Sequence, residues 1–450
     1  MFGLQVTLAR VARRLSRALG RRGGTTLPGR LLLRVQPDAM RRLSAGLEDG
    51  SVLVSATNGK TTTAGMIASI LGRAGRAVVH NRAGSNMHWG VATALLDAGS
   101  SEHEVGIFEV DEAWLAPVAE ALSPRALVLS NLFRDQLDRY GELETLAEGW
   151  ATVVSGGSAA ARLILNADDP LVADLGRERD NVTYFGLEDD SQAVPVLQHA
   201  ADSKHCRNCG AAYEYGAIFM AHLGRYSCPN CGRRRPDPQV AATRVDLKGM
   251  SGSEVEIKTP QGTFTLALPL PGLYNVYNAL AATATGLALG ATVEDVKGAL
   301  GSMSAAFGRT ERIPMAGRDV AILLVKNPAG TNEVLRTLAL EDDQLDLWLA
   351  LNDRIADGRD VSWIWDADFE LIADRAARIT CSGTRAEEMA LRLKYAGVEA
   401  QITVDRDLET SLDSALSAGE GPLYALPTYT ALIDLHDLLT RRGLAGRWSG

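Results

Sequence analysis

The chain has 450 residues, of which 46% are hydrophobic and 22% are charged. This composition is close to the average of globular proteins and excludes disordered, collagenous and coiled-coil classes. The longest apolar run that we find is 320–325, whereas a membrane-spanning helix needs about 20 apolar residues. The formal net charge of −9 argues against a protein whose main role is to coat nucleic acid. We therefore expect a soluble protein, and the length suggests about three domains.

The first 42 residues are charged oppositely to the rest of the chain. They contain ten arginines and one acid, so they carry a formal +9 and the remainder carries −18. Apolar residues at steps of three and four predict an amphipathic helix here: Leu4, Leu8, Val11, Leu15 and Ala18. Arginines interrupt every apolar run, so no secretory signal is predicted. Two interpretations stay open: a helix docked on the following domain, or a segment that also approaches anionic lipid or a phosphorylated substrate.

Four of the five cysteines form two closely spaced pairs, Cys206 with Cys209 and Cys228 with Cys231. A glycine follows each pair and lets the backbone turn beneath a metal. The spacing predicts a zinc ribbon, and four thiolates close the coordination sphere, so the Zn²⁺ would be structural. Two disulfides would instead need an oxidising compartment, for which no export signal is visible. The fifth cysteine, Cys381, follows an apolar stretch and is expected to be buried filler.

A phosphate-binding loop is predicted near the start of the acidic part of the chain. Residues 51–55 have the pattern of a short buried strand, and 56–63 (Ala-Thr-Asn-Gly-Lys-Thr-Thr-Thr) lead into a helical pattern. This order presents backbone N–H groups and a helix N-terminus to a triphosphate. Lys60 would meet the β- and γ-phosphates and Thr61 the Mg²⁺. The strict G-x4-G-K-[ST] pattern is not met, because Val54 occupies the position of the first glycine.

Several strings in a fixed order resemble the Mur ligases and folylpolyglutamate synthases, which join an amine to a carboxylate through an acyl phosphate. They are 57–63 (Thr-Asn-Gly-Lys-Thr-Thr-Thr), 108–112 (Phe-Glu-Val-Asp-Glu), 131–141, 166–170, 275–282 and Gly308-Arg309. The resemblance implies a Mg²⁺ ligand at Glu109 beside Thr61. It also implies an ATP site made of Thr57, Asn58, Gly59, Lys60, Thr61 and Thr62, with Asn278 near the adenine and Arg309 near the phosphates.

Three departures from these families qualify the resemblance. Gln136 stands where a metal-binding histidine is usual, and residues 141–160 contain no lysine that could be carbamylated to hold a second Mg²⁺. The geometry of a second metal site is therefore left open. The phosphate loop also begins after only about 50 residues, too few for the nucleotide-sugar domain that opens a typical Mur ligase. The acceptor is then not expected to be held through a uridine nucleotide.

From about residue 315 the chain alternates strand and helix patterns, which predicts a small, mostly parallel sheet with functional loops at the carboxyl ends of its strands. The expected strands are 320–325, 345–351, 377–381, 399–404 and 423–426. The loop 352–366 contains four acids and two tryptophans. Such a loop is either a solvated turn or, given the tryptophans, part of a pocket or a partner contact.

Five features together resemble the MurT family, the ligase subunits of lipid II isoglutaminyl synthase, over nearly the whole chain. They are the basic N-terminal helix, the string 81–87, the four-cysteine ribbon, 326–330 (Lys-Asn-Pro-Ala-Gly) and 356–366 (Ala-Asp-Gly-Arg-Asp-Val-Ser-Trp-Ile-Trp-Asp). The resemblance implies ATP-dependent amidation of the D-glutamate α-carboxylate in the peptidoglycan stem peptide of lipid II, giving D-isoglutamine. Ammonia would come from a glutaminase subunit, GatD, in a heterodimer.

The resemblance also assigns an acid to the glutaminase partner. One carboxylate of the acidic loop would orient the catalytic histidine of GatD, and motif position puts it at Asp360, with Asp353 and Asp357 as alternatives. The role would be that of the acid in a catalytic triad, which holds the histidine tautomer and stabilises imidazolium. This chain has one non-zinc cysteine and no glutaminase signature, so it is not expected to release ammonia itself.

We therefore predict an α/β protein in three parts. These are a basic helical segment (1–45), a Mur-ligase-like central ATP-binding domain (46–312) with the ribbon inserted at about 200–235, and a C-terminal Rossmann-like α/β domain (313–450). The expected location is the cytoplasm, with the basic segment able to approach the inner face of the membrane. Two alternatives remain open. A folylpolyglutamate-type ligase would leave the ribbon unexplained, and a zinc-ribbon ATPase module would bind nucleic acid in a salt-sensitive way.

Overall fold

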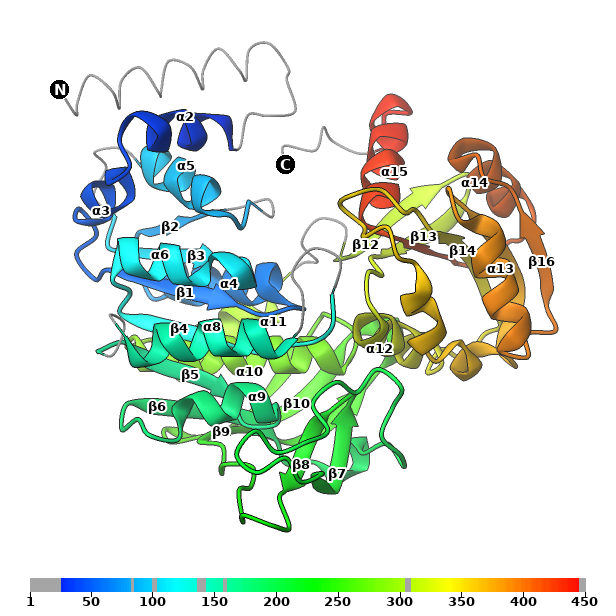
Figure 1. Cartoon of the computed structure of the whole chain (residues 1–450). Helices are drawn as coiled ribbons and strands as arrows, with labels where there is room; N and C mark the ends of the chain where they lie inside the picture. The colour runs from blue at the N-terminus through cyan, green and yellow to red at the C-terminus, as the bar shows by residue number, and fades with distance from the viewer. Residues whose placement is uncertain are drawn as a thin grey trace.

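The computed structural model of the chain describes residues 26–81, 85–98, 103–135, 143–156, 160–303 and 309–444, with the backbone alone for 309 and 310. They form a sheet of nine strands, a sheet of six and a two-stranded hairpin (Figure 1). The amphipathic pattern over residues 4–18 lies outside these ranges. Within them, no helix has both the length and the apolar character needed to cross a bilayer.

The larger sheet is mainly parallel. Its strands are β1 (Ser51–Ser55), β2 (Val78–His80), β3 (Val105–Glu109), β4 (Ala126–Leu129), β5 (Arg162–Asn166), β6 (Val182–Leu187), β9 (Val240–Leu247), β10 (Ser253–Thr259) and β11 (Gly262–Leu268). The order is β11-β10-β9-β6-β5-β4-β1-β3-β2, and β10 alone of these strands runs in the opposite direction, pairing antiparallel with β9 and β11. The predicted strand 51–55 is confirmed as β1, which is buried throughout because helices cover both faces.

Alternate side chains of β1 enter two separate cores, as the two-residue period of a strand requires. Val52 and Val54 pack beneath three helices on one face, and Leu53 packs beneath three on the other. The first group is α4 (Lys60–Arg73), α10 (Leu273–Ala288) and α11 (Val293–Gly301). The second group is α5 (His88–Ala98), α6 (Leu115–Leu122) and α8 (Leu143–Ser155). Outside α5 and α6 lie α2 (Leu27–Val35) and α3 (Ala39–Ser44).

An insertion between β6 and β9 carries the cysteine pairs. It contains the hairpin of β7 (Glu214–Met220) and β8 (Leu223–Ser227) and projects from the edge of the molecule opposite α2 (Figure 1). The insertion also contacts the second sheet's domain. The guanidinium of Arg336 donates hydrogen bonds to the backbone carbonyls of Phe219 (2.9 Å) and Gln192 (2.8 Å).

The C-terminal domain is built on the six-stranded sheet. Its strands are β12 (Arg309–Met315), β13 (Arg318–Leu323), β14 (Leu345–Ala350), β15 (Ala376–Ser382), β16 (Gln401–Val404) and β17 (Leu423–Pro427). The order is β12-β13-β17-β14-β15-β16, in which β12 alone of the described strands is antiparallel. The mostly parallel sheet is thus confirmed. It begins at Arg309, four residues before the predicted domain start at 313.

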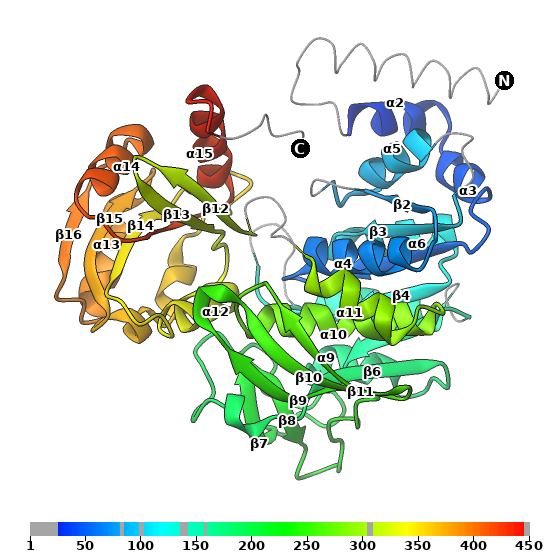
Figure 2. The same ribbon diagram turned by 180° about the vertical axis from the view of Figure 1, so that it is seen from behind.

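Helices again cover both faces of this second sheet. One face carries α12 (Pro328–Leu338) and α13 (Ala386–Tyr395), and the other carries α14 (Leu408–Ser417) and α15 (Tyr429–Arg441). In the view from behind, α12 lies between the two sheets (Figure 2). Its N-terminus therefore faces the loops at the carboxyl ends of the central strands, where an α/β protein builds its ligand site.

Candidate active site

The phosphate loop has a conformation that only glycine allows at its turn. Gly59 adopts a φ of +88°, and a Cβ there would lie 2.1 Å from Oδ1 of Asn278. Asn131 holds the loop from the side. Its Oδ1 accepts a hydrogen bond from the N–H of Asn58 (2.9 Å), and its Nδ2 donates to the Asn58 carbonyl (3.0 Å). The loop thus leads rigidly into the N-terminus of α4, where free N–H groups and the helix dipole favour an anion.

Lys60 lies at the start of α4 among acids. Its Nζ donates to the carbonyl of Ala56 (2.6 Å) and pairs with Oε2 of Glu112 (2.7 Å). Burial by itself would lower the pKa of Lys60, but the carboxylates of Glu112, Asp111 and Glu109 outweigh it and hold the pKa above its usual value. The ammonium is therefore charged at neutral pH and is available to neutralise a phosphate.

Beside it, a hydroxyl and a carboxylate form a pair of oxygen ligands. Thr61 Oγ1 donates to Glu109 Oε2 over 2.8 Å, and Glu109 is only 1% exposed. Asn81 fixes the Glu109 backbone, because its amide exchanges hydrogen bonds of 2.8 Å with the carbonyl and the N–H of that residue. Oxygen donors of this kind at a phosphate site fit Mg²⁺, which prefers carboxylates and hydroxyls together with substrate phosphates.

The C-terminal domain contributes two side chains, Lys326 and Asn327, for which the sequence pattern predicts no role. Lys326 Nζ donates to the Thr57 carbonyl (3.2 Å) and pairs with Asp135. Asn327 exchanges amide hydrogen bonds with Asn58. The available signal was their place directly after a predicted parallel strand, since such loops build ligand sites. What the sequence does not reveal is which loop of the central domain they meet.

Of the other residues predicted to bind the nucleotide, some lie beside the phosphate loop and one has a side chain outside the part of the chain that the structure describes. Thr62 is buried, and Asn278 accepts a hydrogen bond from Thr63 Oγ1 (3.1 Å), so both lie in the first turns around the phosphate loop. The proximity of Asn278 to adenine stays a prediction. Only the backbone of Arg309 is described, and Gln136 lies outside the described residues.

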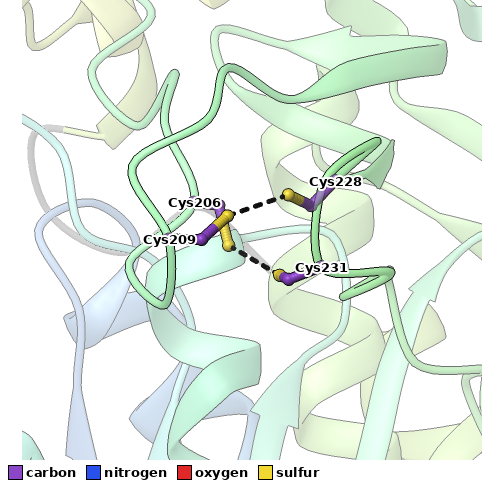
Figure 3. A group of neighbouring side chains, drawn as sticks. All are labelled: Cys206, Cys209, Cys228 and Cys231. Atoms are coloured by element: carbon purple, nitrogen blue, oxygen red, sulfur yellow. Dashed lines mark hydrogen bonds between the residues drawn. The ribbon is translucent and has the colours of Figure 1, made fainter.

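The four paired cysteines converge on one point (Figure 3). Their Sγ atoms all lie within 4.8 Å of one another and are free thiols. The distances across the two pairs are 3.5 Å for Cys206 to Cys231 and 3.4 Å for Cys209 to Cys228. A Zn–S bond of about 2.3 Å places the sulfurs of a tetrahedron about 3.8 Å apart, so the arrangement fits Zn²⁺.

Backbone hydrogen bonds favour the thiolate at one cysteine of each pair, Cys209 and Cys231. Gly210 and Gly232 take φ values of +74° and +72°, as predicted for a turn beneath a metal. A hydrogen bond from the backbone of Arg233 lowers the pKa of Cys231 to about 6. Because metals bind the thiolate, this backbone prepares the site for a cation.

Among the three acids of the 352–366 loop that we considered, Asp360 is the exposed one. Its Oδ1 accepts a hydrogen bond from the N–H of Ser362 (2.8 Å), which lowers the pKa of Asp360 below the usual value. Its carboxylate is therefore ionised at neutral pH and faces solvent.

The two alternative acids are engaged within the domain. Asp357 is buried and accepts hydrogen bonds from the N–H (2.7 Å) and hydroxyl (2.5 Å) of Thr430, the second residue of α15. Asp353 pairs with Nε of Arg385 at 2.8 Å. Both carboxylates are thus committed to holding the loop, which favours Asp360 as the acid for a partner.

The two tryptophans of the loop have different surroundings. Trp363 packs partly buried against the core of the domain. Trp365 is 47% exposed and meets the ring of Tyr395, which is 73% exposed, edge to face at 5.5 Å. The loop is therefore more than a solvated turn, since part of it anchors the domain and part of it presents aromatic surface.

The remaining cysteine cannot act as a nucleophile in this fold. Cys381 lies in β15 with 0% exposure, and burial raises the pKa of its thiol to about 12. The expectation of buried filler is confirmed.

Comparison with known proteins places both domains in one family context. The profile of the Mur ligase middle domain matches residues 54–231, and that of the MurT ligase C-terminal domain matches residues 324–432. Subunit MurT of the glutamine-hydrolysing lipid II isoglutaminyl synthase of Staphylococcus aureus (strain N315) is 33% identical over 97% of each chain. The MurT of Streptococcus pneumoniae (strain ATCC BAA-255 / R6) is 33% identical over 98% of each chain.

Solved structures share the fold at lower identity. A pseudomurein peptide ligase type C from Methanothermus fervidus superposes with a TM-score of 0.69 and 22% identity, covering 88% of this chain and 79% of that one. The folylpolyglutamate synthase of Mycobacterium tuberculosis, complexed with ADP and AMPPCP, gives 0.62 and 14% identity over 93% and 99%. The predicted Mur-ligase fold is confirmed.

Proposed function

Because this chain belongs to the MurT family of ligase subunits, we propose that it amidates the D-glutamate α-carboxylate in the stem peptide of lipid II, using ATP. The observation that carries the proposal is the meeting of two lysines and a ligand pair at one loop. Lys60 comes from the central domain, Lys326 comes from the C-terminal domain, and the Thr61–Glu109 pair lies beside them. Cations from two domains around one phosphate loop suit the transfer of a phosphoryl group between two bound substrates.

In the first step, a carboxylate oxygen of the acceptor attacks the γ-phosphorus of ATP. The bond from that phosphorus to the β,γ-bridging oxygen breaks, ADP leaves, and an acyl phosphate forms. Lys60 exchanges its contact with Glu112 for the phosphates, and Lys326 faces the same charge from the opposite domain. Gly59 offers its backbone N–H group to the phosphates, and Arg309 is the further cation that motif position suggests.

Two metals fit the chain's own ligands. Thr61 and Glu109 would hold Mg²⁺, which supplies charge neutralisation for the phosphates when bound. Cys206, Cys209, Cys228 and Cys231 would hold structural Zn²⁺.

In the second step, ammonia attacks the acyl carbon. The bond from carbon to the phosphate oxygen breaks, and one proton passes from nitrogen to the released phosphate, leaving the amide. The ammonia comes from a partner, since the Cys381 thiol is sealed inside β15. We assign that role to a glutaminase subunit of the GatD kind and propose that the exposed Asp360 orients its histidine across the interface. A lipid-linked acceptor would place the complex at the inner face of the cell membrane.

The test is incubation of the chain with lipid II, ATP and glutamine, with and without the glutaminase partner, followed by mass measurement of the stem peptide. Conversion of a carboxyl group to an amide lowers the mass by about one dalton, which addition of an amino acid cannot mimic. We expect the shift only when ATP is present together with a source of ammonia. That source is either glutamine with the glutaminase partner or free ammonia. A mass gain of one glutamate residue would instead support a folylpolyglutamate-type ligase.

A further inference from the structure

The helix α2 presents an apolar stripe to solvent. Leu27, Leu31 and Val35 recur every four residues and are 42%, 43% and 62% exposed. Since residues four apart lie on the same face of a helix, these three side chains form one continuous strip. Exposed single leucines are ordinary, but a contiguous stripe along one helix marks a surface that contacts something apolar.

Exposed cations lie on α2 beside this stripe and on the helix that follows it. Arg30 and Arg34 are exposed on α2, and Arg41 is exposed on the next helix, α3. No acid in the described ranges pairs with any of these three arginines. Helix α2 has no acidic residue, and the nearby Asp38 pairs with Arg42. An apolar strip bordered by uncompensated arginines complements an anionic lipid surface, where the leucines enter the headgroup boundary and the arginines meet phosphates.

The opposite face of α2 is fixed rigidly to the enzyme. Gly29 lies so close to α5 that a Cβ there would be 2.0 Å from the carbonyl of Trp89, and its N–H donates to Thr93 Oγ1 at 2.9 Å. Both views place α2 over α5 at the periphery of the molecule (Figures 1 and 2). A close glycine contact inside and an apolar stripe outside give α2 two faces with separate roles.

Beside the stripe, Arg30 lies over an aromatic ring of the enzyme. The guanidinium of Arg30 lies 5.6 Å from the ring of Trp89, which packs at 5.6 Å against Trp114. Trp114 is in the short helix Glu112–Trp114, whose first residue pairs with Lys60. A bilayer that contacts α2 would therefore lie on the flank of the domain that carries this acid.

We propose that the outward face of α2 is a docking surface for an anionic lipid bilayer. Leu27, Leu31 and Val35 insert at the headgroup boundary, while Arg30 and Arg34 contact lipid phosphates. This inference deepens the proposed function, because a lipid-linked acceptor would reside in the same membrane.

The experiment measures co-sedimentation of the full chain with vesicles of phosphatidylcholine, alone or mixed with phosphatidylglycerol. We expect binding to the anionic vesicles at low salt and its loss as salt screens the charges. The variant Arg30→Gln/Arg34→Gln should bind roughly 25-fold more weakly, because each cation near an anionic surface contributes about fivefold. The variant Leu27→Gln/Leu31→Gln/Val35→Gln should lose about tenfold or more. Glutamine keeps good helix propensity, and unfolding temperature checks that each variant folds.

A matched control is available on another helix. Leu391 and Tyr395 are also spaced by four on α13 and are 48% and 73% exposed. The variant Leu391→Gln/Tyr395→Gln should bind vesicles as the unaltered chain does. The proposal is overturned if the unaltered chain ignores anionic vesicles. It is also overturned if the α2 stripe variant binds anionic vesicles as tightly as the unaltered chain. The same conclusion holds if the stripe variant differs from the unaltered chain only in its oligomeric state, measured by light scattering.

Failure of this inference can be told apart from failure of the proposed function. A water-soluble muramyl peptide acceptor, assayed with the glutaminase partner, needs no membrane. The α2 variants should amidate it at the unaltered rate, whatever the vesicles show. Absence of amidation by the unaltered complex, on either acceptor, would reject the function and leave the vesicle result standing.

Discussion

Asn58 and Asn327 exchange hydrogen bonds between their side-chain amides, at 3.2 and 3.0 Å, across 269 residues of sequence. Asn58 belongs to the phosphate loop, and Asn327 caps the N-terminus of α12 through a bond from the Gly330 N–H (2.9 Å). The pair ties the phosphate loop to the domain that carries the acidic loop. Because each amide both donates and accepts, the pair stabilises this arrangement of the two domains.

Asn327 thus has two roles, the cap of α12 and the amide pair with Asn58, and its replacement by serine separates them. Serine keeps the helix cap but is too short to reach Asn58. We expect the unfolding temperature to change little. The KM for ATP should rise by about three- to tenfold, which corresponds to the free energy of the lost hydrogen bonds. Steady-state kinetics at saturating acceptor measure this. An unchanged KM would mean that the amide pair has no part in ATP binding.

Lys60→Ala should reduce ATP-dependent amidation by at least about 100-fold, as removal of a preorganised charge at a transition state does. It should also destabilise the fold, since Glu112 and Asp111 lose their buried counter-ion. The double variant Lys60→Ala/Glu112→Gln separates these effects. It should recover thermal stability without recovering activity, and normal amidation by either variant would refute the assignment.

Asp360→Asn should remove glutamine-supported amidation while ATP binding and ammonia-supported amidation continue. The reason is that the neutral amide cannot stabilise imidazolium in the partner. Asp353→Asn is the matched control, because that acid lies in the same loop but pairs with Arg385. Product formation from glutamine and from ammonium chloride should be compared. Full glutamine use by Asp360→Asn would contradict the shared triad.

Cys209→Ser should abolish zinc binding, measured as metal content per chain, and lower the unfolding temperature. Metal binding stabilises a small insertion of this kind directly. Cys381→Ser tests the specificity of the effect, because Cys381 lies in the other domain, buried in β15. The Cys381→Ser variant should retain one zinc per chain, even if the substitution lowers the stability of the protein. Loss of zinc in Cys381→Ser, or its retention in Cys209→Ser, would disprove the ribbon site.

Glu333 predicts a pH dependence of stability. It is 1% exposed in α12, neither of its carboxylate oxygens has a hydrogen-bond partner among the described residues, and Arg336 Nη1 lies 4.0 Å away. Burial raises its pKa to about 7, against the lowering effect of Arg336. The folded state thus holds a proton that the unfolded state has lost, so stability falls as pH rises from about 4.5 to about 7.

The variant Glu333→Gln removes this titration. The difference in free energy of unfolding, variant minus unaltered chain, should increase by on the order of 3 kcal/mol from pH 5 to pH 7.5, because only the unaltered chain loses stability there. Above that range the difference should be constant. Unfolding temperatures of both proteins across the pH range measure the difference. A difference that does not change with pH would show that Glu333 is not protonated in the folded state.

Local patterns were sufficient for much of the fold. The strand at 51–55 was predicted to the residue, and five strands of the C-terminal sheet were predicted to within two residues at each end. The cysteine spacing likewise predicted a cluster that the structure brings within 4.8 Å. Periodicity, turn residues and ligand spacing are properties of a few neighbouring positions, so they can be recognised without knowledge of the whole chain.

Tertiary structure decided which distant residues share the site. Nothing near Lys326 in sequence indicates that it meets Thr57, because that contact depends on how two sheets pack. The choice among acids has the same origin. Asp357 and Asp360 are three residues apart and alike in sequence, but α15 brings Thr430 onto Asp357 and leaves Asp360 in solvent. Burial and partners belong to the folded surface, and they determine which carboxylate is held within the domain and which is free to act.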